Sequence, residues 1–212
     1  MLDKHIVPRI KPLLASGARR LHCTGISANQ VTVAGFFVGM LCVPAMALGQ
    51  PLLALICLLT NRIADGLDGE LARLDSPSDA GSFLDITLDF IFYASFPLGF
   101  ALHHPSSNAL PAAFLIASFV GTGASFLAFA SQAEKHSIQS RDFAYKGLYY
   151  LDGLAEGTET IVCFALMCLL PAHFALLAWT FAGICLLTTI NRVYSGYQTL
   201  NAQRSAGRDK DC

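Results

Sequence analysis

The sequence predicts an all-α protein that crosses a lipid bilayer several times, and three observations support this fold class. Hydrophobic residues make up 54% of the chain and charged residues 14%, with a mean hydropathy of +0.51, whereas soluble domains carry about 25% charged residues. Six largely apolar stretches are separated by short polar turns. Finally, Lys and Arg gather on one side of these stretches. The net charge of -1 leaves no basic excess for nucleic acid, and the apolar composition excludes a disordered chain.

Residues 1–22 are predicted to form an amphipathic helix that lies in the membrane interface and precedes the first span. Apolar and basic residues recur at helical spacing on opposite faces: Ile6, Ile10, Leu13, Leu14 and Leu21 against Lys4, Lys11 and Arg19. A secretory signal is disfavoured, because no uninterrupted apolar core follows the first residues.

The six predicted transmembrane helices form one domain over residues 23–200, followed by a cytoplasmic tail at 201–212. A bilayer core about 30 Å thick is crossed by about 20 apolar residues. The stretches that qualify are 31–49, 51–74, 81–103, 110–132, 155–171 and 174–199. The turns after the first, third and fifth stretches contain no Lys or Arg, so the positive-inside rule places both termini and the 133–154 segment in the cytoplasm.

The seven cysteines predict neither a disulfide framework nor a zinc site. The sequence has no C-x-x-C pair, and most of the cysteines stand inside apolar runs. A cysteine in such a run behaves as a small hydrophobic residue.

An acidic cluster interrupts the second and third spans, where seven of the 15 carboxylates fall within residues 65–89. An ionised Asp at the bilayer centre costs about 2.5–3.5 kcal/mol, so such residues face the protein interior and mark functional sites. Helical spacing aligns Asp65 with Asp68 on one helix and Asp85 with Asp89 on the next. The turn at 75–80 makes these helices antiparallel, so the four carboxylates are expected to surround one small volume.

Four like charges at close range require counter-charge, and oxygen ligands favour hard divalent ions such as Mg²⁺ or Mn²⁺. Gly69 and Gly81 stand beside the carboxylates and leave room for a bulky or phosphorylated group. The residues themselves therefore indicate a metal-dependent phosphate site.

At these positions the sequence resembles the CDP-alcohol phosphotransferase (CDP-alcohol phosphatidyltransferase) family. The family pattern is D-x-x-D-G-x-x-A-R, seven or eight residues, and G-x-x-x-D-x-x-x-D. Its fixed positions are matched by Asp65, Asp68, Gly69, Ala72, Arg73, Gly81, Asp85 and Asp89.

The resemblance implies a homodimeric enzyme of phospholipid biosynthesis in a bacterial inner membrane. It implies transfer of a phosphatidyl group from a CDP-linked lipid to an alcohol, with release of CMP, in a site that opens to the cytoplasm. By similarity, Asp65, Asp68, Asp85 and Asp89 hold two Mg²⁺ or Mn²⁺ ions, and Asp89 also accepts the proton of the attacking hydroxyl. Gly69, Ala72 and Gly81 line the cytidine pocket, and Arg73 helps to hold the pocket or the phosphates.

Asn29 and Thr32, before and within the first span, have two interpretations. Either Ser27 or Asn29 serves as the N-cap of the helix, or, by the resemblance, Asn29 and Thr32 lie near the nucleotide. Relatives often have a proline at the place of Ala28, which weakens the second interpretation.

The acceptor is predicted less directly than the donor. Lys135, Arg141 and Lys146 satisfy the positive-inside rule, and relatives that accept phosphorylated alcohols use basic residues from this side. We therefore expect glycerol 3-phosphate, with inositol phosphate, serine or another polyol as alternatives. A cation transporter is the alternative of a different class, because intramembrane carboxylates also mark ion pathways.

Four further charged residues have open roles. Arg62 stands one turn before Asp65, and we expect it to pair with an acidic neighbour rather than to contact substrate. Glu156 and Glu159 begin the fifth span, where carboxylates favourably meet a helix N-terminus. Arg192 serves either in packing or in the pocket.

Overall fold

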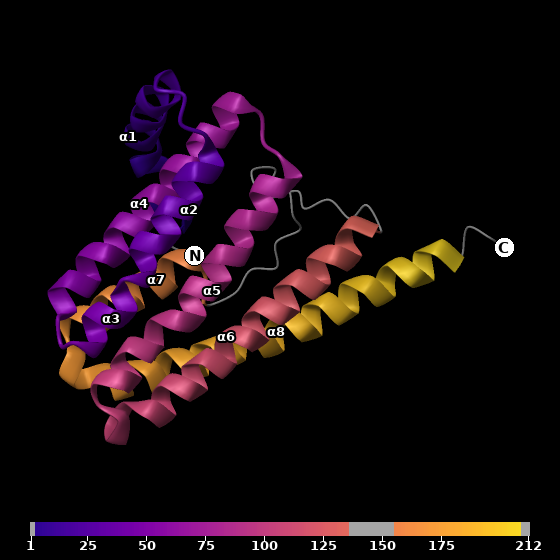
Figure 1. The fold of residues 1–212 in the computed structure, drawn as a ribbon. Helices are drawn as coiled ribbons and strands as arrows, with labels where there is room; N and C mark the ends of the chain where they lie inside the picture. Colours follow the sequence, from indigo (N-terminus) through magenta and orange to yellow (C-terminus); the bar gives the residue numbers. More distant parts are fainter. Residues whose placement is uncertain (1–2, 136–154, 209–212) are drawn as a thin grey trace.

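The computed structural model describes residues 3–135 and 155–208, which form helices joined by short turns (Figure 1). The helices are α1 (Asp3–Cys23), α2 (Ala28–Met40), α3 (Cys42–Ala47), α4 (Pro51–Asp75), α5 (Asp79–His103), α6 (Pro105–Lys135), α7 (Gly157–Leu169), the 3₁₀ turn η1 (Pro171–His173) and α8 (Phe174–Arg208). Within these ranges there is no β-strand, and the predicted all-α fold class is confirmed.

Four helical stretches are long and apolar enough to cross a bilayer, namely Ala28–Ala47, Asp79–His103, Pro105–Lys135 and Pro171–Asn201. They correspond to the first, third, fourth and sixth predicted spans. Helix α4 has 25 residues but carries the charged cluster, and α7 has only 13. The protein is therefore a membrane protein with at least these four apolar helices among the described residues, and the six-span count stays a prediction.

The first predicted span is broken in two at Leu41, between α2 and α3. Pro44 explains the break, because a proline lacks the amide hydrogen and its ring clashes with the carbonyl four residues earlier. That carbonyl belongs to Met40, where α2 ends.

Helix α1 packs against α4 near the α4 C-terminus (Figure 1). A Cβ atom added at Gly66 would lie 2.7 Å from Leu14 Cδ1, and one at Gly17 would lie 2.9 Å from Leu67 Cδ2. His22 Nδ1 also lies 3.0 Å from Asp75 Oδ1. The predicted N-terminal segment is thus helical, while its location in the membrane interface stays a prediction.

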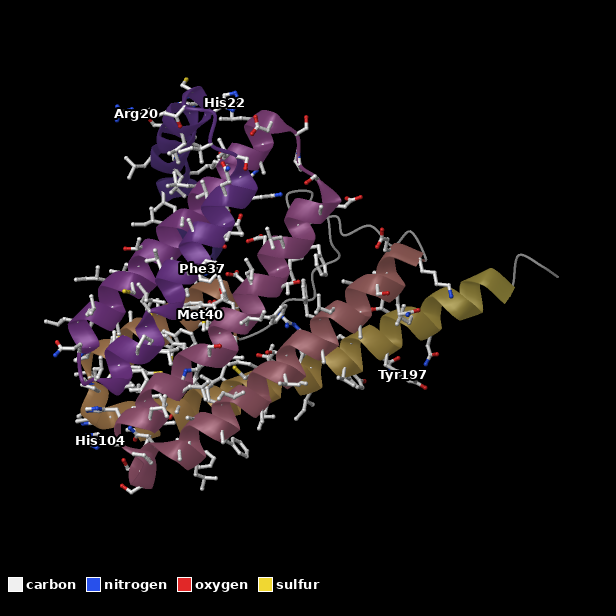
Figure 2. The ribbon with its side chains drawn as sticks, in the orientation of Figure 1. Arg20, His22, Phe37, Met40, His104 and Tyr197 are labelled. Atoms are coloured by element: carbon white, nitrogen blue, oxygen red, sulfur yellow. The ribbon has the colours of Figure 1, made fainter. Side chains whose placement is uncertain are left out.

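Phenylalanine rings fill the core where α5, α7 and α8 meet. Phe96 stacks on Phe164 with ring centroids 4.0 Å apart, and Phe100 stacks on Phe174 at 4.3 Å. All four side chains are almost completely buried. His104 lies at the opposite end of the molecule from Arg20 and His22 (Figure 2), and Phe100 stands one turn before His104, near the C-terminal end of α5.

Helices α6 and α8 run side by side as a long pair (Figure 1). Arg192 is buried in this pair, where its Nη1 donates a hydrogen bond to the Thr122 carbonyl at 3.3 Å. Its guanidinium also lies 5.6 Å from the centre of the Phe126 ring. These contacts favour the packing interpretation of Arg192. The six cysteines among the described residues are all free.

Candidate functional site

A short turn between α4 and α5 brings the two acidic stripes together. Helix α4 ends at Asp75, and Ser78 caps the start of α5 by accepting a hydrogen bond from the Gly81 amide at 3.1 Å. A serine side chain is a favourable N-cap because it satisfies an amide that has no partner within the helix. Only residues 76–78 separate the two helices, and α2 packs against both of them.

Three of the predicted ligands meet in a geometry that suits a metal ion. Asp65, Asp68 and Asp85 each offer a carboxylate oxygen, and these oxygens all lie within 4.8 Å of one another. Asp68 is only 5% exposed, and its Oδ2 is buried without a hydrogen-bond partner among the described residues. A buried carboxylate oxygen without a partner is costly, and a hard cation would satisfy it. The residues present therefore fit a divalent ion.

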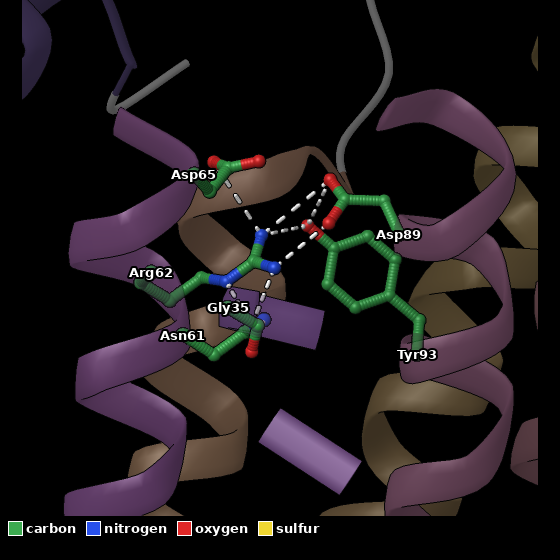
Figure 3. Close-up of polar contacts among 6 residues, drawn as sticks. All are labelled: Gly35, Asn61, Arg62, Asp65, Asp89 and Tyr93. Carbon is green, nitrogen blue, oxygen red and sulfur yellow. Dashed lines mark hydrogen bonds and ion pairs between the residues drawn. The ribbon is translucent and has the colours of Figure 1, made fainter. Parts of the chain in front are cut away.

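The fourth aspartate, Asp89, has a different partner (Figure 3). Its Oδ1 accepts a hydrogen bond from Arg62 Nη2 at 2.7 Å, and its Oδ2 lies 3.5 Å from both Arg62 Nη1 and the Tyr93 hydroxyl. Arg62 Nη1 also lies 3.6 Å from Asp65 Oδ2. The expected pairing of Arg62 with an acidic neighbour is confirmed, and it involves carboxylates from both helices.

All four aspartates nevertheless line one pocket of about 240 Å³, part of which is open to solvent. Arg62 and Thr32 also line it. The expectation that the four carboxylates surround one small volume therefore agrees with the structure. That all four hold metal stays a prediction.

Helix α2 completes the pocket through a close approach to α4 that the sequence analysis missed. A Cβ at Gly35 would lie 2.5 Å from Ala64 Cβ, and one at Gly39 would lie 2.8 Å from Asn61 Cγ. Asn61 Nδ2 donates a hydrogen bond to the Gly35 carbonyl at 3.0 Å. The spacing Gly35-x-x-x-Gly39 was the available signal, because small residues four apart let membrane helices approach closely.

The start of α2 decides between the two N-cap candidates. Ser27 is the N-cap, and it forms a capping box with Gln30. Asn29 is therefore not needed as a cap, and a Cβ at Gly81 would lie 3.0 Å from its Oδ1. Thr32 Oγ1 donates a hydrogen bond to the Ala28 carbonyl at 3.0 Å and lines the pocket.

The remaining predicted nucleotide residues lie on α4 beyond the pocket lining. A Cβ at Gly69 would meet only Arg73 Nη1, at 4.0 Å, so packing within the protein does not require glycine there. Arg73 forms an ion pair with Glu70, and Ala72 is half-buried. These residues leave space beside Asp68, and their contact with a nucleotide stays a prediction.

The predicted acceptor residues are separate from this pocket or fall outside the described part of the chain. Lys135 is exposed at the C-terminal end of α6. Arg141 and Lys146 lie outside the described residues. Glu156, at the N-cap position of α7, is buried, and Glu159 lies in the first turn of that helix.

Residues 26–191 match the sequence model of CDP-alcohol phosphatidyltransferases. The chain belongs to this family. It is also 54% identical to the inner membrane protein YnjF of Escherichia coli. The alignment spans 202 residues, which make up 95% of this chain and 98% of that protein. Archaetidylinositol phosphate synthase of Pyrococcus horikoshii is 39% identical over 103 residues, or 48% of this chain and 54% of the relative.

A crystal structure of Mycobacterium tuberculosis phosphatidylinositol phosphate synthase with CDP-DAG bound has the same fold. The TM-score is 0.68 at 17% identity, and the match covers 88% of this chain and 94% of that chain. For a structure of the same enzyme with manganese and citrate, the TM-score is 0.70 at 16% identity. That match covers 87% of this chain and 88% of that chain. Family membership makes the chain a transferase of substituted phosphate groups in a membrane.

Proposed function

We propose that the protein transfers a phosphatidyl group from a CDP-linked lipid such as CDP-diacylglycerol to a polar alcohol and releases CMP. The observation that carries the proposal is the convergence of Asp65, Asp68 and Asp85 around the buried, unpartnered Oδ2 of Asp68. A family transferase needs a place for the pyrophosphate of its donor, and this oxygen cluster is suited to cations that bind phosphate.

In the proposed reaction, the acceptor oxygen attacks the phosphorus that carries the lipid, and the bond from that phosphorus to CMP breaks. Divalent ions, when bound, neutralise the phosphate oxygens and stabilise the leaving group. Asp65, Asp68 and Asp85 hold the cations by their carboxylates. Asp89 lies one turn further along α5 and accepts the proton of the acceptor hydroxyl, while Arg62 and Tyr93 hold its carboxylate in place.

The open surface beside Gly69 is the proposed place of the cytidine. The position of a Cβ there is nearly empty, so a planar group can approach the α4 backbone. Ala72, Gly81 and the side chains of Asn29 and Thr32 border the same region in the proposal, with Arg73 as a contact to the phosphates.

For the acceptor, we propose a phosphorylated polyol and place inositol phosphate ahead of glycerol 3-phosphate. Two relatives are an archaetidylinositol phosphate synthase and a phosphatidylinositol phosphate synthase. Glycerol 3-phosphate, the acceptor expected from the sequence, is supported by neither relative. Lys135, Arg141 and Lys146 are the proposed contacts to the acceptor phosphate.

The proposal includes an inner-membrane location, as for the Escherichia coli relative. We also propose six spans, a site and termini on the cytoplasmic side, and a homodimer. The charge distribution supports the orientation. Cysteine labelling from each side of sealed vesicles tests it.

The decisive experiment measures CMP release by the purified full-length protein with CDP-diacylglycerol and a panel of acceptors. The panel contains inositol phosphate, glycerol 3-phosphate, serine and free inositol, each with Mn²⁺ or Mg²⁺ and with excess chelator. We expect metal-dependent CMP release with a phosphorylated polyol and none from Asp68→Asn. Full turnover in excess chelator would rule out the metal mechanism, and ion flux through vesicles without CMP release would favour the transporter alternative.

A further inference from the structure

Arg62 has a place in the site that the family pattern does not assign. It stands on α4 between Asp65 of its own helix and Asp89 of α5, within 3.6 Å and 2.7 Å of their respective oxygens (Figure 3). Its side chain is only 13% exposed, less than that of Asp65 at 36% or Asp89 at 29%. The guanidinium is therefore a built-in positive charge inside the acidic pocket.

The surroundings of Arg62 hold it there. Asn61 Oδ1 accepts hydrogen bonds from Arg62 Nε at 2.8 Å and from Nη2 at 2.6 Å, and Asn61 is itself bonded to the Gly35 carbonyl of α2. The Tyr93 hydroxyl lies 3.0 Å from Nη1. The guanidinium could move away from Asp89 only by breaking these hydrogen bonds.

Two aromatic rings add to this support. The Arg62 guanidinium carbon lies 5.3 Å from the centre of the Phe92 ring and 5.4 Å from that of Tyr93. Cations at this distance from a ring are attracted to it, the more so where water is excluded. Because a guanidinium keeps its charge in proteins, the positive charge beside Asp89 is permanent.

A balance of formal charge shows what this residue does to cation binding. The four ionised aspartates carry four negative charges, which two divalent ions alone would neutralise. Arg62 adds one positive charge, so the pocket with two ions would carry a net positive charge. Arg73 does not alter the balance, since Glu70 pairs with it. Excess charge in a partly buried site is unfavourable.

We propose that Arg62 is a fixed internal counter-ion that limits the free pocket to one tightly bound divalent ion and admits a second only together with the pyrophosphate of the donor. The inference rests on the proposed function of the same site. With the two negative charges of a CDP-linked pyrophosphate, a pocket that holds two ions returns to a net charge of minus one, the same as that of the free pocket with one ion. The first ion belongs to Asp65, Asp68 and Asp85, whose oxygens already converge, and Asp89 stays with Arg62 until the donor arrives.

The proposal predicts opposite results for a neutral and for a charged replacement. Full-length protein in lipid nanodiscs is titrated with Mn²⁺ alone, and free Mn²⁺ is measured by electron paramagnetic resonance, before and after CDP-diacylglycerol is added. We expect one tight Mn²⁺ per wild-type chain without the donor and two with it. Arg62→Lys should behave as wild type. Arg62→Met should take up two ions without the donor, the second at least about tenfold more tightly than wild type.

If Arg62 were only structural, Mn²⁺ affinity would change in the opposite direction. Loss of the arginine would then disorder Asp89 and weaken cation binding. Two tight ions on the wild-type chain without donor, or one on Arg62→Met, would overturn the proposal. Arg62→Gln is a second neutral variant should Arg62→Met fail to fold, and Arg192→Met is the matched control, a buried arginine outside the pocket that should leave the stoichiometry at one.

The same titration separates this inference from the proposed function. If the wild-type chain binds no Mn²⁺ with or without CDP-diacylglycerol, the metal site itself is wrong and both proposals fail. If the ions bind in the expected order but no acceptor yields CMP, the proposed reaction fails while the assignment of Arg62 stands.

Discussion

The two ends of α5 differ in chemistry although one helix contributes to both. Near the turn at 76–78, carboxylates and one arginine face each other around an open pocket. Further along α5, Phe96 and Phe100 stack on rings from α7 and α8 with no polar partner in those stacks. The aromatic end supplies rigidity, and the acidic end can then hold like charges close together. Substitutions at the two ends should therefore change different measured quantities.

The largest effect is expected at the aromatic end. Phe100→Ala removes a ring that is 1% exposed and stacked on Phe174, and such a cavity typically costs about 3–5 kcal/mol of unfolding free energy. Thermal unfolding in detergent should show a marked loss of stability. The folded fraction should still bind Mn²⁺ as wild type does. Loss of Mn²⁺ binding from folded protein would show that the two ends are not separable.

At the acidic end of the same helix, Asp89→Asn should leave stability nearly unchanged. Asparagine keeps the shape of the side chain and can still accept a hydrogen bond from Arg62, but it cannot take up a proton. Turnover should fall by about 10² or more, as loss of a general base does, while CDP-diacylglycerol still binds. Turnover within a few-fold of wild type would remove the base assignment.

The smallest change tests the empty space beside the carboxylates. A methyl group at Gly69 meets nothing closer than 4.0 Å in the protein, so Gly69→Ala should not lower the unfolding temperature. If cytidine approaches this backbone, the KM for the donor should rise on the order of tenfold, because overpacking by a methyl costs about 1–3 kcal/mol. Gly69→Leu should block the donor more strongly. An unchanged donor KM in both variants would place the nucleotide elsewhere.

The acidic stripes were predictable because helical periodicity and a short turn decide which residues of α4 and α5 share a face. Asp65, Asp68 and Asp85 are thus found together by spacing alone. The break at Leu41 followed from Pro44, which the sequence analysis placed inside one continuous span. The shortness of α7 was also missed, since an apolar run does not reveal where a helix ends.

Asp65 follows Arg62 by three residues on the same helix, but the other partners of Arg62 could not be derived from spacing within one helix. Asn61 is fixed by a carbonyl of α2, 26 residues away in the sequence, and that contact depends on how deeply α2 settles onto α4. Tyr93 approaches from α5, so its hydroxyl reaches Arg62 only through the relative height of the two helices. The position of one helix along another is set by packing between helices. In the sequence, the spacing of Gly35 and Gly39 was the signal for that packing.

The glycine contact between α2 and α4 also restricts how the protein can move. Because the side chains of Ala64 and Asn61 lie against Gly35 and Gly39, a shift of either helix along the other would bring these side chains into collision with α2. We therefore expect α2 and α4 to travel as a rigid body through each turnover. Movements of α5 and its neighbours would then open the site. Such movements would let a donor with two acyl chains enter from the bilayer and let CMP leave into water.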